Sequence, residues 1–144
     1  MSEPGVGPTS PQAPVTVDGL LAAARAALDR LEPPAAMAAR EAGAVLIDIR
    51  AESERARDGA IPGARLIPRN VLEWRLDPRS DRRDREIAES ENRVILICQE
   101  GYQSSLAAAT LRRLGVDATD VVDGFQGWRA AGLPIEPTTG APAD

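Results

Sequence analysis

The stretch RVILICQEGYQSSLAAATL (residues 93–111) indicates the fold class, because it changes from a strand pattern to a helix pattern around one cysteine. Residues 94–97 are consecutive apolar residues, mostly β-branched, which predicts a strand buried on both faces of a parallel sheet. From residue 104 onward apolar residues recur at helical spacing until Gly115, a residue that commonly ends helices. Cys98, the single cysteine of the chain, lies between the predicted strand and the predicted helix.

The segments on both sides repeat this alternation of strand and helix. Further strands are predicted at residues 44–50, 64–68 and 117–124, and helices at residues 18–31, 32–44, 69–76 and 125–132. Alternating elements predict an α/β fold with a mostly parallel sheet sandwiched by helices. We expect one domain at 17–136, flanked by disordered tails at 1–16 and 137–144, since Pro, Gly, Ser and Thr dominate the first tail.

The composition excludes several functional classes. The net charge of −5 argues against a surface that binds nucleic acids or anionic membranes. Residues 1–14 have neither a basic start nor an apolar core, so we expect no signal peptide and a cytoplasmic location. The chain has no histidine, and its 17 basic residues are all arginine. Triads with histidine, His-bearing metal sites and lysine Schiff bases are therefore excluded.

Cys98 is the remaining candidate nucleophile. In open α/β sheets ligands bind beyond the carboxyl ends of strands, where Cys98 is predicted to lie. Gly101 permits a sharp turn that directs backbone N–H groups inward, and the following helix adds positive charge at its N-terminus. Such a cup favours a thiolate without any general base in the loop. The alternative, that Cys98 is only a small core residue, stays open at this point.

The loop CQEGYQS (98–104) resembles the C-x-x-G-x-x-S active-site loop of the rhodanese-like sulfurtransferase domain. The segment LIDIRAESERARDGAIPGARLIP (46–68) is similar to that family's LIDVR…E…GHIPGA…IP segment, with Ala60 in place of the histidine. The segment VVDGFQGWRAAGLPIE (121–136) resembles its closing pattern of glycines, a tryptophan and a proline. The order and spacing of all three blocks agree over about residues 30–136.

The resemblance implies a three-layer sandwich with a five-stranded parallel sheet, to which residues 18–31 would add an N-terminal helix. It also implies that Cys98 takes sulfur from a donor such as thiosulfate, forms a persulfide, and passes the sulfur to cyanide, a thiol or an acceptor protein. No cofactor or metal is implied. The expected substrate-binding residues are the loop and two arginines: Gln99, Glu100, Gly101, Tyr102, Gln103, Ser104, Ser105, Arg50 and Arg75.

Two other functions compete with this interpretation. Phosphatases and arsenate reductases with a C-x5-R loop need an arginine six residues after the cysteine, where this chain has Ser104. A rhodanese-like module used only for binding or regulation is the other alternative, although such modules often lack the cysteine.

Two charged groups near the expected site also lead to predictions. Acidic Glu100 would disfavour a dianionic donor, and Asp48 with Arg50 is expected to form a structural ion pair, in which Glu54 could take part.

Overall fold

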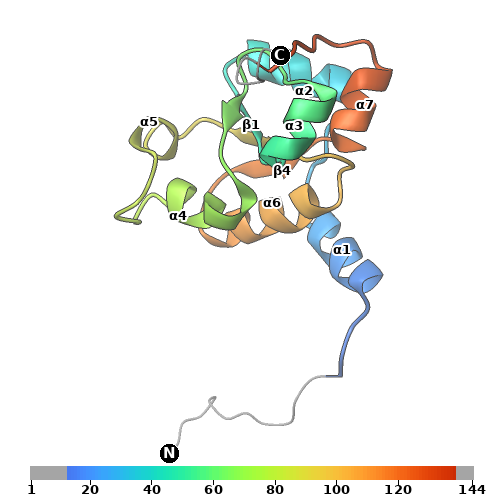
Figure 1. The fold of residues 1–144 in the computed structure, drawn as a ribbon. Coiled ribbons are helices and arrows are strands. Elements are labelled where there is room, and N and C mark those ends of the chain that lie inside the picture. The colour runs from blue at the N-terminus through green and yellow to red at the C-terminus, as the bar shows by residue number, and fades with distance from the viewer. Residues whose placement is uncertain (1–12, 139–144) are drawn as a thin grey trace, which may run out of the picture.

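The computed structural model describes residues 13–138, which form a parallel sheet covered by helices on both faces (Figure 1). The sheet has the order β2-β1-β3-β4, and every neighbouring pair is parallel. Its strands are β1 (Val45–Asp48), β2 (Arg65–Leu66), β3 (Val94–Ile97) and β4 (Ala118–Asp120). The predicted α/β class with a parallel sheet is therefore confirmed.

Two helices precede β1, and the others lie between the strands or after β4. They are α1 (Val17–Ala26), α2 (Pro33–Glu41), α3 (Glu52–Asp58), the 3₁₀ turn η1 (Arg69–Val71), α4 (Leu72–Leu76), α5 (Arg85–Ala88), α6 (Gln103–Arg113) and α7 (Gly124–Ala130). Among the helices of residues 13–138 none combines the length and apolar character that a membrane crossing requires.

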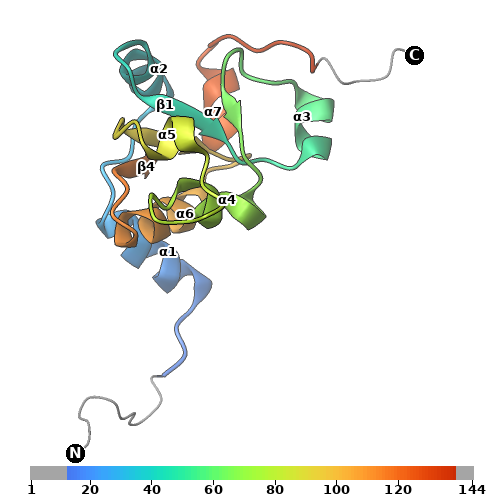
Figure 2. The same ribbon diagram turned by 90° about the vertical axis from the view of Figure 1, so that its left-hand side faces the viewer.

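Two hydrophobic cores lie on opposite faces of the sheet, because successive strand side chains alternate between the faces. Ile47 and Leu96 belong to the core under α4, α5 and α6, whereas Leu46 and Ile95 belong to the core under α2 and α7. Figure 2 shows α4 and α6 below the sheet and α2 and α7 above it. The chain is thus a sandwich of helix, sheet and helix, and α1 packs against the outer side of α6.

The predicted five strands are wrong: the sheet of the described residues has four. Where a fifth strand would flank β4, Leu31 forms only an isolated parallel bridge with Val121. The pairing stops there because Pro33 and Pro34 follow and α2 begins at Pro33. Proline has no N–H to donate to a ladder, and at the first turn of a helix it loses nothing by lacking one.

The helix predicted at 18–31 is present but shorter, since α1 ends at Ala26 and is capped by the Thr16 side chain rather than by Asp18. The chain after Ala26 turns and runs extended beside β4, where Leu31 N donates to the Asp120 carbonyl. That α1 is an addition to a family domain stays a prediction. The predicted disordered tails lie outside the described residues, apart from 13–16 and 137–138.

Candidate functional site

Cys98 directly follows β3 at the carboxyl end of the sheet, and only 2% of its surface is exposed. The loop after it is pinned to the start of α7, because Phe125 N donates to the Cys98 carbonyl at 2.8 Å. The two segments approach closely through two glycines. A Cβ on Gly124 would lie 2.4 Å from the Cys98 carbonyl oxygen, and a Cβ on Gly101, which has φ +88°, would lie 2.9 Å from Asp123 N.

Backbone donors converge on the Cys98 sulfur, as the loop pattern predicted. Gly101 N lies 3.1 Å and Ser104 N 3.4 Å from Sγ, and both donate to it. The Cys98 thiol in turn donates to Ser104 Oγ at 3.2 Å. Ser105 N does not join this cradle, since it donates to the Tyr102 carbonyl instead. Two amides, and not the whole loop, therefore face the sulfur.

Neither Ser104 nor Ser105 caps α6, because both lie inside the helix, after its N-cap Tyr102. Their hydroxyls instead donate to a carboxylate on the neighbouring strand. Each Oγ lies 2.7 Å from Asp120 Oδ2, and all three side chains are fully buried. Asp120 was not among the predicted site residues. The one signal in the sequence was a carboxylate inside the predicted strand at 117–124, and nothing there indicated which side chain it would meet.

The outer surface of the loop forms an open pocket of about 440 Å³ beside Cys98. Four of the predicted substrate-binding residues line it, together with residues from α3 and α7; the lining consists of Glu54, Arg57, Cys98, Gln99, Glu100, Tyr102, Gln103 and Gln126. Glu100 is exposed at this surface. Arg75 lies on α4 outside the lining, and its Nη1 donates to the Arg82 carbonyl.

The pocket carries more negative than positive charge. Arg57 is the basic residue of its lining, and Asp58 beside it holds the pKa of that guanidinium above its usual value through a hydrogen bond. The same bond from Arg57, with one from Gln99 Nε2 at 2.7 Å, lowers the pKa of Asp58 to about 2. Asp58 therefore offsets the charge of Arg57, and Glu54 and Glu100 leave the pocket acidic.

The predicted ion pair of Asp48 and Arg50 is present and fully buried, with Arg50 Nη2 2.8 Å from Asp48 Oδ2. The same nitrogen donates to the Gly59 carbonyl at 2.8 Å, and the guanidinium lies 3.9 Å from the centre of the Phe125 ring. Glu54 takes no part, since its carboxylate accepts from Ala51 N. Arg50 is thus placed as a support at the end of β1, behind the pocket wall.

Comparison with known proteins places this geometry in context. A family model for the Rhodanese-like domain matches residues 32–131. The thiosulfate sulfurtransferase GlpE of Actinobacillus succinogenes is 33% identical over 98 residues, which are 67% of this chain and 79% of that protein.

Among the solved structures that are similar to the chain, two carry names that bear on function. One is a protein of unknown function from Rhodopseudomonas palustris, named a possible tyrosine phosphatase, with a TM-score of 0.78, 32% identity and coverage of 89% of this chain and all of that one. The other is a thiosulfate sulfurtransferase from Pseudomonas aeruginosa, with a TM-score of 0.61 and 26% identity, matched over 78% of this chain and 20% of that one.

Proposed function

Because the chain belongs to the Rhodanese-like domain family, we propose that it is a sulfurtransferase that carries a sulfane sulfur as a persulfide on Cys98. The observation that carries this proposal is the convergence of Gly101 N and Ser104 N on Sγ at the edge of an open pocket. Fixed backbone dipoles of this kind stabilise negative charge on a reacting atom without reorganising during the reaction.

The reaction would proceed in two balanced steps. The Cys98 thiolate attacks the outer sulfur of the donor, a sulfur–sulfur bond forms, and the leaving group departs with the electron pair of the bond that breaks. An acceptor thiolate or cyanide then attacks the terminal sulfur of the persulfide and releases the Cys98 thiolate. The two amides support the charge on Sγ before the first step and after the second.

Loading of one sulfur atom tests the proposal directly. After incubation with thiosulfate or a small-molecule persulfide, intact mass spectrometry is expected to show one added sulfur, about 32 Da, that dithiothreitol removes. Prior alkylation of Cys98 is expected to prevent the addition, and the chain has no other cysteine that could be alkylated. If no donor adds sulfur to the folded protein, the alternative of a non-catalytic binding module replaces the proposal.

The charge of the pocket bears on the donor. Glu54 and Glu100 line it, and the charge of Arg57 is offset by Asp58, so a dianionic donor meets repulsion. This favours a donor of lower charge than thiosulfate, such as the persulfide of a thiol or of a protein. The identity of the acceptor and a cytoplasmic location are further parts of the proposal. Transfer of sulfur from the loaded protein to candidate thiols tests the first, and fractionation of cells tests the second.

We expect Glu100→Lys to lower the KM for thiosulfate about three- to tenfold at low salt, because it replaces a repulsive charge at an exposed position with an attractive one. The gain is expected to shrink as the salt concentration rises. Glu41→Lys makes the same charge change on α2, outside the pocket lining, and is expected to leave KM unchanged. Equal effects of the two variants, or none from Glu100→Lys, would show that Glu100 does not face the donor.

The name of the Rhodopseudomonas palustris protein makes phosphatase activity the second candidate. Phosphate esters are usually held by an arginine that forms two parallel hydrogen bonds. Six residues after the cysteine this chain has Ser104, whose hydroxyl is buried and donates to Asp120. Turnover of p-nitrophenyl phosphate that is lost on alkylation of Cys98, without any sulfur loading, would favour the phosphatase.

A further inference from the structure

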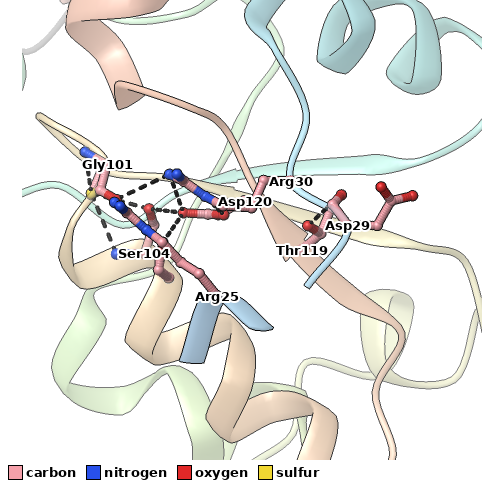
Figure 3. Close-up of polar contacts among 9 residues, drawn as sticks. Arg25, Asp29, Arg30, Gly101, Ser104, Thr119 and Asp120 are labelled. Carbon is pink, nitrogen blue, oxygen red and sulfur yellow. Dashed lines mark hydrogen bonds and ion pairs between the residues drawn. The ribbon is translucent and has the colours of Figure 1, made fainter. Parts of the chain in front are cut away.

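Two arginines that precede the matched family domain reach the back of the Cys98 loop. Arg25 lies in the last turn of α1, and Arg30 lies in the extended segment that follows. The family model begins at residue 32, so both residues lie outside it. Figure 3 shows the two side chains pointing toward Gly101 and Asp120.

The first contact is with the Gly101 carbonyl oxygen. Arg25 Nη2 donates to it at 2.8 Å and Arg30 Nη2 at 3.2 Å. Glycine has the widest backbone freedom of any residue, and this glycine supplies the N–H that lies 3.1 Å from Sγ. Two charged donors on its carbonyl restrict that freedom and hold the N–H on the sulfur.

The second contact is with the carboxylate that orients Ser104. Arg30 Nε lies 2.8 Å from Asp120 Oδ1, and Arg30 Nη2 lies 3.2 Å from Oδ2. A fully buried carboxylate without a partner would be strongly unfavourable, and Arg30 supplies that partner. Asp120 engages the Ser104 hydroxyl proton, and the Ser104 oxygen then faces Sγ at 3.2 Å.

Arg25 makes two further contacts with the Cys98 loop. Its Nε donates to Ser105 Oγ at 3.0 Å, and its guanidinium lies 5.9 Å from the centre of the Tyr102 ring. The two guanidinium groups and the Asp120 carboxylate leave one net positive charge behind the loop. This charge adds to the stabilisation of an anionic sulfur that the amides provide.

The segment that carries these arginines is also attached by contacts remote from the sulfur. Thr119 Oγ1 donates to the Asp29 carbonyl at 2.8 Å, Arg93 pairs with Asp29 at 3.6 Å, and Leu31 bridges to Val121. Removal of either of the first two contacts takes one attachment from the same segment and leaves the contacts of Arg25 and Arg30 with Gly101 and Asp120 in place. They therefore supply matched controls.

We propose that Arg25 and Arg30 are positioning residues that clamp the Cys98 loop from the N-terminal segment, through the Gly101 carbonyl and Asp120. The catalytic part of this proposal rests on the proposed sulfurtransferase function. The clamp itself is a property of the folded loop, and a measurement that needs no donor can test it.

The test compares Arg25→Gln and Arg30→Gln with the controls Thr119→Val and Arg93→Gln. In each arginine variant we expect kcat for sulfur transfer to fall about tenfold, with the donor KM within about twofold of the wild type, because the clamp touches the loop and not the donor. We also expect the amides of residues 98–105 to exchange hydrogen about tenfold faster, measured by mass spectrometry of that peptide. The controls are expected to change neither quantity.

If a glutamine variant fails to fold, lysine variants at the same positions still test the clamp. Arg25→Lys retains a cation that can reach the Gly101 carbonyl and is expected to recover part of the loss. Arg30→Lys cannot reproduce the two-pronged contact with Asp120 and is expected to recover less. The clamp is refuted if exchange of the loop amides is unchanged in folded arginine variants, or if the controls accelerate it equally. If the wild-type protein transfers no sulfur, the exchange measurement still decides whether the clamp exists.

Discussion

Cys98→Ser is expected to abolish sulfur transfer, with a loss of more than about 10³-fold, while the protein keeps its fold. The serine oxygen cannot form the sulfur–sulfur bond that holds the transferred atom, and its hydroxyl is far harder to ionise than a thiol. Folding is expected to survive because a hydroxyl oxygen can accept from Gly101 N and Ser104 N and can donate to Ser104 Oγ, as the thiol does.

The measurement is the rate of sulfur transfer by the variant and the wild type at the same concentration, with thermal melts of both. Intact mass after incubation with the donor adds a direct check, since the variant is expected to gain no sulfur. Turnover by folded Cys98→Ser above the uncatalysed rate would contradict the persulfide mechanism, because the chain has no second thiol to take over.

Arg50→Ala is expected to lower the free energy of unfolding by about 3–5 kcal/mol, because it leaves the buried Asp48 carboxylate without its partner. It also removes the donor to the Gly59 carbonyl and the cation over the Phe125 ring. For a domain of this size the loss corresponds to a fall in Tm of about 10–20 °C. Urea unfolding followed by circular dichroism measures it.

Two further variants separate the buried pair from a general effect of losing an arginine. Arg112→Ala removes a partly exposed ion pair with Asp117 and is expected to cost less than about 1 kcal/mol. The double variant Asp48→Leu with Arg50→Met replaces both charges by apolar groups and is expected to recover most of the stability that Arg50→Ala loses. A cost of Arg50→Ala as small as that of Arg112→Ala would show that Asp48 tolerates the loss of its partner.

The sequence determined the strands and the position of Cys98. An apolar, mostly β-branched run such as residues 94–97 is stable in an α/β protein as a strand buried on both faces. The residue after this strand then lies at the carboxyl edge of the sheet. Gly101 likewise identified the turn that brings N–H groups onto Sγ, since its φ of +88° is unfavourable for other residues. Short local patterns suffice for such features because their causes are local.

The sequence pattern did not predict the short helices α3 and α5. At least half of the residues in α3 and in α5 are charged, and the two segments are too short and carry too few apolar residues for a helical stripe to be recognised. In the structure α3 supplies Glu54 and Arg57 to the pocket, and Ile87 of α5 packs into one of the cores. Tertiary contacts with the rest of the molecule, rather than their own periodicity, account for these helices.

The side chains behind the Cys98 loop come from distant parts of the chain, and the tertiary structure brings them together. Arg25 and Arg30 look like solvated charges in the sequence, and Asp120 is one of three aspartates in residues 117–124. The two arginines are 71 to 90 residues distant from the groups that they bind in the loop and in β4. The parallel pairing of β3 with β4 places Asp120 beside the Cys98 loop, and the bridge of Leu31 to Val121 brings the arginines to it. Burial then makes these three charges depend on one another, a coupling that no spacing along the chain encodes.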